Sequence, residues 1–167
     1  MSTTKNLFNE EAVAKIKNLA DGGFVMLCTD LDSKPFSSCP MSVQQVDDQG
    51  NLWFFSGKDS DHNADIRNAP ATQVLLANSS DSDYLSLYGK STITEDRSKI
   101  EELWSPAVKT WFQEGKDDPN LSLIRFTPDE GFYWDTKNGK MVAMAKMMAS
   151  VVTGKTMDDD VEGTLKV

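Results

Sequence analysis

Three consecutive aromatic residues, Trp53, Phe54 and Phe55, constrain the fold of this chain more than any other feature. Aromatic side chains favour extended strands, and the polar residues 56–62 that follow are typical of a loop and a helix start. We therefore predict a strand over 52–56, a short loop and a helix capped by Ser60. Hydroxyl groups, an ammonium group and a helix N-terminus together make this segment a candidate phosphate site. The alternative is an ordinary strand, turn and capped helix that binds nothing.

The charge balance limits the partners of the chain. Its 167 residues include 17 Lys and Arg against 26 Asp and Glu, which gives a net charge of -9. Such a surface repels phosphate backbones and anionic lipid headgroups, so we predict neither a nucleic-acid nor a membrane partner. The length predicts one domain over 1–167, with a mobile acidic tail from about residue 154.

The cysteines and the first residues indicate a reducing compartment. Cys28 and Cys39 each fall within a strand pattern, and we interpret both as free thiols. Residues 1–9 lack the apolar segment of a signal peptide, and no apolar run approaches the length of a membrane span. We expect a cytoplasmic protein.

Apolar patterns along the chain predict a mainly β protein with flanking helices. The expected strands cover 24–29, 38–44, 52–56, 72–78, 84–93, 121–126 and 132–134, with a compact turn over 127–131. The expected helices cover 10–20, 60–68, a segment capped by Thr94, a short segment over 106–112, and a Met-rich segment over 140–152. Antiparallel strands with helices inserted between them predict a closed or nearly closed barrel.

Several kinds of chemistry lack the residues they need. His62 is the only histidine and has no cysteine pair near it in sequence, which excludes the usual zinc spacings and leaves a histidine-dependent hydrolase without an identifiable nucleophile. The acidic segments 30–33 and 81–83 lack the glycine and glutamate of a calcium loop, so we interpret them as solvated turns. Glycine-rich nucleotide motifs are absent from the sequence.

An ordered set of segments along nearly the whole chain carries a family resemblance. The segments are 24–29, 38–41, 52–56, 60–66, 68–70, 84–89, 96–106, 111–119 and 133–135, and the most specific pair is 103–106 with 111–119. Together they resemble the pyridoxamine 5'-phosphate oxidase-like proteins of the general stress protein branch. The resemblance implies an FMN-binding split β-barrel, antiparallel and of Greek-key type.

The resemblance also implies where the FMN phosphate would lie. In the family, basic side chains at two positions hold the phosphate, and here those positions carry Cys39 and His62. The remaining phosphate donors would be Ser56, Lys58 and Ser60 with the helix N-terminus, and His62 when it is protonated. Because hydrogen bonds from charged donors contribute about 1.5 to 3 kcal/mol each, we expect weakened FMN binding.

The flavin ring and a dimer interface follow from the same resemblance. The ring would lie against Met41, Val43 and the backbone of Phe54 and Phe55, with Tyr84 contributing from the opposite strand. Trp104 and Trp111 would lie at a homodimer interface near the partner's flavin. Ordinary core packing is the alternative interpretation for all of these side chains.

The resemblance implies a flavin-dependent oxidoreductase with a nicotinamide electron donor, although no catalytic acid or base is identifiable. Two alternatives stay open. One is a flavin-binding or flavin-storing protein without turnover, and the other is a split barrel that has lost FMN and has a structural or small-ligand role.

Overall fold

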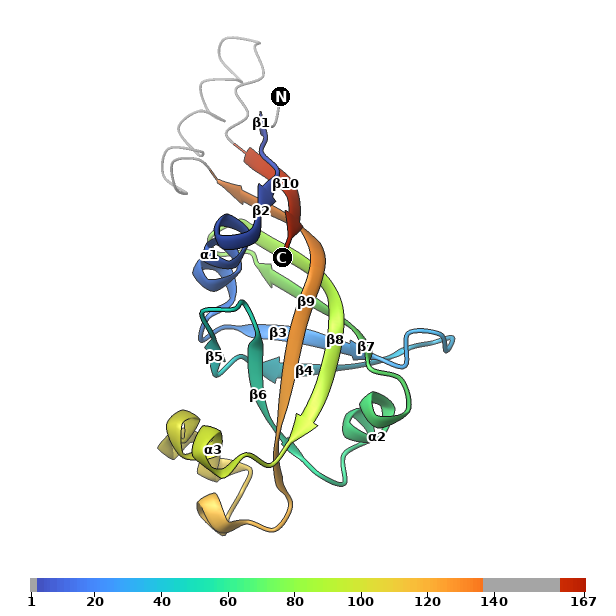
Figure 1. Ribbon diagram of the computed structural model, residues 1–167, viewed down its shortest axis with the longest axis vertical. Helices are drawn as coiled ribbons and strands as arrows, with labels where there is room; N and C mark the ends of the chain where they lie inside the picture. The colour runs from blue at the N-terminus through green and yellow to red at the C-terminus, as the bar shows by residue number, and fades with distance from the viewer. Residues whose placement is uncertain (1–2, 137–159) are drawn as a thin grey trace.

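Two long antiparallel strands, β8 (Asp83–Thr94) and β9 (Leu121–Thr136), extend through the length of the molecule (Figure 1). The structure is a computed structural model that describes residues 3–136 and 160–167. On the β8 side the sheet continues through β7 (Ala71–Asn78), β3 (Phe24–Thr29) and β4 (Ser37–Ser42). On the other side β9 pairs with β10 (Asp160–Lys166) and with β6 (Leu52–Gly57).

Short strands and helices complete the fold. The short strands are β1 (Thr3–Thr4), β2 (Leu7–Phe8) and β5 (Gln45–Val46). The helices are α1 (Asn9–Ala20), α2 (Asp61–Asn68) and α3 (Arg97–Leu103), followed by the 3₁₀ turns η1 (Pro106–Thr110) and η2 (Gly115–Asp117). The prediction of a mainly β fold with flanking helices is confirmed. Among the helices in 3–136 and 160–167, none is long and apolar enough to cross a membrane.

The sheet differs from the predicted antiparallel, closed or nearly closed barrel, because it is mixed and is not closed into a barrel. Strands β1 and β2 run parallel to β10, whereas the other strand pairs are antiparallel. β4 ends at Ser42 and pairs with β3, but β5 begins at Gln45 and pairs with β6, so the ring of strand pairs is interrupted between them. Two backbone hydrogen bonds of 2.8 Å span the interruption, from the Val43 amide to Gly23 and from the Gln44 amide to Trp53.

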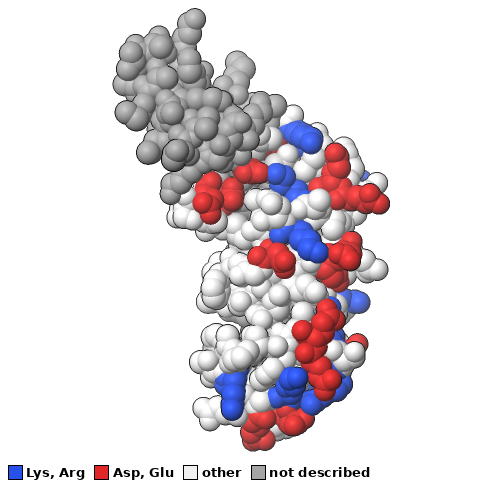
Figure 2. Space-filling view, turned by 90° about the vertical axis from the view of Figure 1, so that its left-hand side faces the viewer, with Lys and Arg blue, Asp and Glu red and all other residues white. Residues whose placement is uncertain are grey.

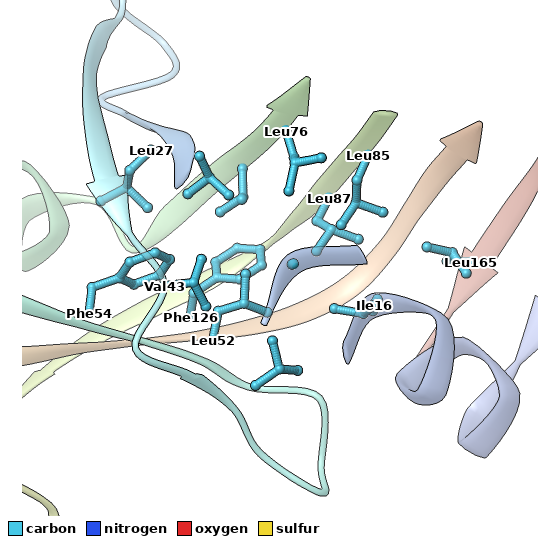
Figure 3. Packing of buried hydrophobic residues seen from close by; sticks show 14 of the residues in the cluster. Ile16, Leu27, Val43, Leu52, Phe54, Leu76, Leu85, Leu87, Phe126 and Leu165 are labelled. Atoms are coloured by element: carbon cyan, nitrogen blue, oxygen red, sulfur yellow. The ribbon is translucent and has the colours of Figure 1, made fainter. Parts of the chain in front are cut away.

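β6 contributes side chains to two separate cores. Successive strand residues point to opposite faces, so Leu52 and Phe54 enter the main core while Trp53 and Phe55 face a second one. The main core lies between the sheet and α1, where Ile16 meets the buried side chains of β6, β8 and β9 (Figure 3). The second core lies under α3 and η1 and contains Trp53, Ile100, Val108, Phe112, Leu121 and Leu123. Because both faces of β6 are covered by a core, its consecutive aromatic residues 53–55 all find apolar surroundings.

The charges on one face of the molecule are mixed. In Figure 2, Lys and Arg side chains lie next to Asp and Glu along one edge, and much of the remaining surface is uncharged. Ion pairs at the surface include Lys17 with Asp48 and Lys99 with Glu102. Mixed charges of this kind attract a polyanion weakly.

The predicted turn over 127–131 is wrong, because β9 continues through it. Tyr88 pairs with Glu130 while its neighbour Gly89 pairs with Pro128, which leaves Asp129 as the extra residue of a β-bulge. A Cβ atom on Gly89 would lie 2.1 Å from the Thr127 carbonyl oxygen, so only glycine allows this approach. The bulge and the glycine accommodate turn-forming residues within a strand.

Two further predictions need correction, and one falls outside the described residues. Thr94 is not the cap of α3, because the Asp96 carboxylate accepts from the amides of Ser98 and Lys99 at 3.0 and 3.3 Å. Residues 160–166 of the expected mobile tail form β10, which pairs with β9 and the N-terminal strands. The Met-rich segment over 140–152 lies outside the described residues.

Asp83 carries a perturbed carboxyl group at the start of β8. Burial, a hydrogen bond with Asp135 and the charges of Asp135 and Asp81 together raise its pKa to about 6, while the charge of Lys15 acts in the opposite direction. The folded protein therefore binds this proton more tightly than the unfolded chain does. The resulting stabilisation is fully present below the unfolded pKa near 3.8 and is lost as pH rises through about 6.

We predict that Asp83→Asn stabilises the protein at neutral pH, because the amide removes a carboxylate that is costly to ionise there. The gain should shrink as pH falls through about 6 and should be absent below the unfolded pKa near 3.8, where Asp83 is protonated in both states. Urea unfolding midpoints at neutral and acidic pH measure the difference. Asp129→Asn, an exposed acidic residue on β9, is the control. Identical midpoints for wild type and Asp83→Asn at neutral pH would contradict the prediction.

Candidate functional site

Two adjacent hollows lie where α2 meets β4 and β6, and both are lined by His62. The polar hollow has a volume of about 630 Å³ and is lined by Thr29, Ser37, Ser38, Cys39, Asp59, Ser60, Asp61 and His62. The apolar hollow has a volume of about 330 Å³, and its apolar lining comes from Phe24, Pro40, Met41, Phe55, Val108, Trp111 and Phe112. Polar residues at its edge are Ser42, Gln44, Ser56, His62 and Asn120. The apolar hollow suits a flat apolar group, and the adjacent polar hollow suits a polar chain.

The start of α2 is fixed as the sequence predicted. The Ser60 hydroxyl accepts from the Asn63 amide at 3.3 Å and donates to the Gly57 carbonyl at 2.7 Å. A second attachment comes from Thr29 on β3, which donates to the Asp65 carboxylate at 2.8 Å. These bonds hold the helix N-terminus against both hollows.

A buried hydroxyl network joins α2 to β6 and β9. Ser122 accepts from the Asn63 side-chain amide at 3.0 Å and donates to the Ser56 carbonyl at 2.9 Å. Because Ser122 has a single proton, the 2.9 Å contact between the two hydroxyls requires Ser56 to donate. Ser56, which the resemblance placed among the phosphate donors, therefore uses its hydroxyl proton within the protein.

His62 and Cys39 form an uncharged pair. The Cys39 Sγ lies 3.7 Å from the His62 Nδ1. Burial lowers the pKa of His62, although the charges of Asp65 and Asp61 act in the opposite direction. Burial also raises the pKa of Cys39, as does the nearby Cys28. The neutral thiol and neutral imidazole are not the thiolate–imidazolium pair of an activated cysteine nucleophile.

The His62 ring also carries a buried nitrogen, Nε2, without a hydrogen-bond partner in the described part of the chain. The sequence suggested His62 as a cation for an anionic ligand. A lowered pKa leaves it neutral at physiological pH.

The charged side chains near the hollows differ from those expected. Lys58 lines neither hollow, because its Nζ lies 2.8 Å from a carboxylate oxygen of Glu95. Asp59 and Asp61, which sequence reasoning missed, line the polar hollow. No Lys or Arg lines either hollow in the described part of the chain. The alternation of acidic residues around Ser60 was the available signal.

The remaining predicted site residues divide into two groups. Met41, Phe55 and Trp111 line the apolar hollow. The other four predicted side chains line neither hollow. Val43 and Phe54 are buried in the main core (Figure 3), and Tyr84 is exposed on β8. Trp104 packs edge-on against Phe55, with ring centroids 5.8 Å apart. Core packing accounts for the buried members of this second group.

Comparison with known proteins identifies the family. The model of the family described as pyridoxamine 5'-phosphate oxidase like matches residues 11–158. The chain belongs to this family. Among curated proteins, it is 25% identical to protein bli-3 of Neurospora crassa over 141 residues, which is 77% of this chain and 67% of the relative. It is 28% identical to general stress protein 26 of Bacillus subtilis over 78 residues, 45% of this chain and 55% of the relative.

Solved structures of similar proteins match most of this oxidase-like chain. A protein named as a candidate general stress protein 26 of Jannaschia sp. CCS1 superposes with a TM-score of 0.77 at 25% identity, covering 93% of this chain and 95% of that one. The general stress FMN/FAD binding protein of Xanthomonas citri superposes with a TM-score of 0.64 at 28% identity, covering 74% and 87%. The resemblance to the general stress protein branch is thereby confirmed.

We predict that Ser122→Ala destabilises the protein by about 1–3 kcal/mol, because the Asn63 amide and the Ser56 hydroxyl would each lose a buried partner. Urea unfolding measures the change. Ser98→Ala, an exposed serine on α3, is the matched control. If Ser122→Ala lowered the free energy of unfolding no more than Ser98→Ala does, the stabilising role of the hydroxyl network would be contradicted.

Proposed function

We propose that this protein binds a flavin, with the isoalloxazine ring in the apolar hollow and the tail along the polar hollow. The observation that carries the proposal is the pair of adjoining hollows, one lined by Met41, Phe55, Trp111 and Phe112 and the other by hydroxyl groups. A flavin has the same division, since a flat aromatic ring system is joined to a polyol chain. Apolar pockets with a few polar groups at one end are typical ligand sites.

Family membership supports the same proposal. The similar Xanthomonas citri protein is named for FMN or FAD binding, and the family is named for an oxidase. We infer that this mixed sheet is a split barrel of Greek-key type, as the resemblance implies, with its opening at the interruption between β4 and β5. We infer a cytoplasmic location as well.

The residues present fit the two ends of FMN unequally. The ring end of FMN meets aromatic and apolar side chains, which suit it. The phosphate end would meet Asp59 and Asp61, a neutral His62 and a protonated Cys39, and Lys58 is paired with Glu95. A phosphate carries close to two negative charges, so this donor set does not suit it. FMN binding is weakened at that end.

We also propose that the bound flavin takes part in redox chemistry. A bound flavin supplies hydride and electron transfer by itself, and the protein provides orientation and electrostatics. We infer a weak oxidoreductase that takes electrons from a nicotinamide cofactor. Oxidation of NADH in the presence of added flavin distinguishes this activity from storage without turnover.

We predict that flavin fluorescence is quenched when the protein is titrated into it, and that Trp111→Ala weakens binding roughly two- to tenfold through loss of a ring contact. Trp111 is 70% exposed, so its removal should leave stability unchanged. Tyr88→Ala, an exposed aromatic outside both hollows, is the control and should bind as wild type does. An absence of quenching by wild type would favour a fold that has lost its flavin.

We also propose a homodimer. Phe24 and Trp111, which both line the apolar hollow, are 73% and 70% exposed. Phe24 and Met26 alternate on the outer face of β3, and Met26 is paired in register with the exposed Leu75 of β7. Exposed apolar side chains gathered in this way mark an interaction surface. A second copy on this surface would cover the apolar hollow.

We predict that light scattering gives the mass of a dimer at micromolar concentration and that Phe24→Glu yields monomers, because the charge would be buried at the interface. Phe36→Glu introduces the same charge at an exposed aromatic residue in the loop that follows β3, at the opposite end of that strand from Phe24, and should remain dimeric. A monomeric wild type would refute the shared surface.

A further inference from the structure

We propose that the site prefers a flavin whose tail ends in a hydroxyl group, as riboflavin does, over one that ends in a phosphate, as FMN does. This inference rests on the proposed flavin binding and specifies its ligand. It follows from the charges and hydrogen-bonding groups that line the polar hollow.

The charged groups of the polar hollow all carry the wrong sign for a phosphate. Asp59 and Asp61 line it, and no Lys or Arg does so within the described residues. Neither aspartate forms an ion pair with a described residue. The nearest lysine in sequence, Lys58, is held by Glu95 at 2.8 Å. A phosphate in this hollow would meet uncompensated like charges.

The hydrogen-bonding groups of the hollow lead to the same conclusion. A phosphate dianion only accepts hydrogen bonds, and so do the two carboxylates. Ser60 already donates to Gly57, and Thr29 already donates to Asp65, so neither hydroxyl proton is free for a ligand. The hollow therefore presents two carboxylates as acceptors, and the donors left for a ligand are the hydroxyls of Ser37 and Ser38 and the N-terminal amides of α2.

A polyol chain matches such a lining. Each of its hydroxyl groups can donate to a carboxylate, and hydrogen bonds to a charged acceptor are the stronger kind. Asp59 and Asp61 can accept from it, and the hydroxyls of Ser37 and Ser38 can bond to it in either sense. The buried Nε2 of His62, which has no partner among the described residues, is a further polar atom at the junction of the hollows.

Titrations of the full-length protein with riboflavin and with FMN at neutral pH and low salt test the preference. Because the two ligands share the ring and the ribityl chain, the ratio of their dissociation constants isolates the terminal phosphate. We expect riboflavin to bind at least tenfold more tightly. Raising the salt concentration should strengthen FMN binding and leave riboflavin binding unchanged, because salt screens the repulsion between exposed charges. This measurement needs no variant.

The double variant Asp59→Asn/Asp61→Asn tests the residues assigned. We expect its FMN affinity to rise at least threefold while its riboflavin affinity stays equal or falls. The control Asp129→Asn/Glu130→Gln changes the net charge by the same amount at exposed positions of β9 that line neither hollow. The ratio of its dissociation constants for FMN and riboflavin should equal that of wild type. Cys39→Arg and His62→Lys should each raise FMN affinity roughly tenfold or more, because each adds a charged donor.

The outcomes separate this inference from the proposed function. Equal or tighter binding of FMN by wild type would overturn the preference while leaving a flavin site in place. If wild type and Asp59→Asn/Asp61→Asn had the same ratio of FMN to riboflavin dissociation constants, these two carboxylates would not be the cause of the preference. Failure of wild type to bind either flavin would overturn the proposed function itself.

Discussion

One buried hydroxyl group, that of Ser122 on β9, attaches α2 to β6, and these are two of the elements that line the candidate site. It joins α2, β6 and β9 through contacts of 2.9 to 3.0 Å with Asn63 and Ser56, all of them shielded from water. A net contribution of about 1 kcal/mol for each such bond is modest, but an unpartnered group in the same place costs about 1–3 kcal/mol. The helix therefore cannot move away from the sheet without leaving several polar groups unsatisfied, and the walls of both hollows keep their relative positions.

The strand pattern could be read from the sequence wherever local alternation determined it. Strand β3 has the predicted limits, and β6 and α2 differ by one residue at an end. The failures have long-range causes. The turn-forming residues of 127–131 stay in β9 because a glycine on β8 lets the two backbones approach at a bulge. The acidic composition of the tail predicted a mobile segment, yet residues 160–166 find partners on β9 and on the N-terminal strands, more than 120 residues away in sequence for the latter.

The candidate site was predictable at its apolar end and not at its polar end. Met41, Phe55 and Trp111 were identified through the resemblance, and they do line one hollow. The state of each polar group depends on neighbours distant in sequence. Ser56 gives its proton to Ser122, Lys58 pairs with Glu95, and burial lowers the pKa of His62. None of these relations is visible in the residues 56–62 alone, where the same side chains are typical of an anion site.

The two ends of the site also respond differently to substitution. Contact between a flat ring and apolar side chains is non-directional and is spread over many residues, so a related sequence can exchange several of them and still hold the ring. Recognition of a phosphate depends on a few charged donors, so a thiol and a neutral imidazole at two positions change it without affecting the core. Membership of the family therefore carries more information about the ring end of a ligand than about its tail. In this chain Asp59 and Asp61 line the polar hollow, and they lie in the loop before α2 and in its first turn rather than in the sheet.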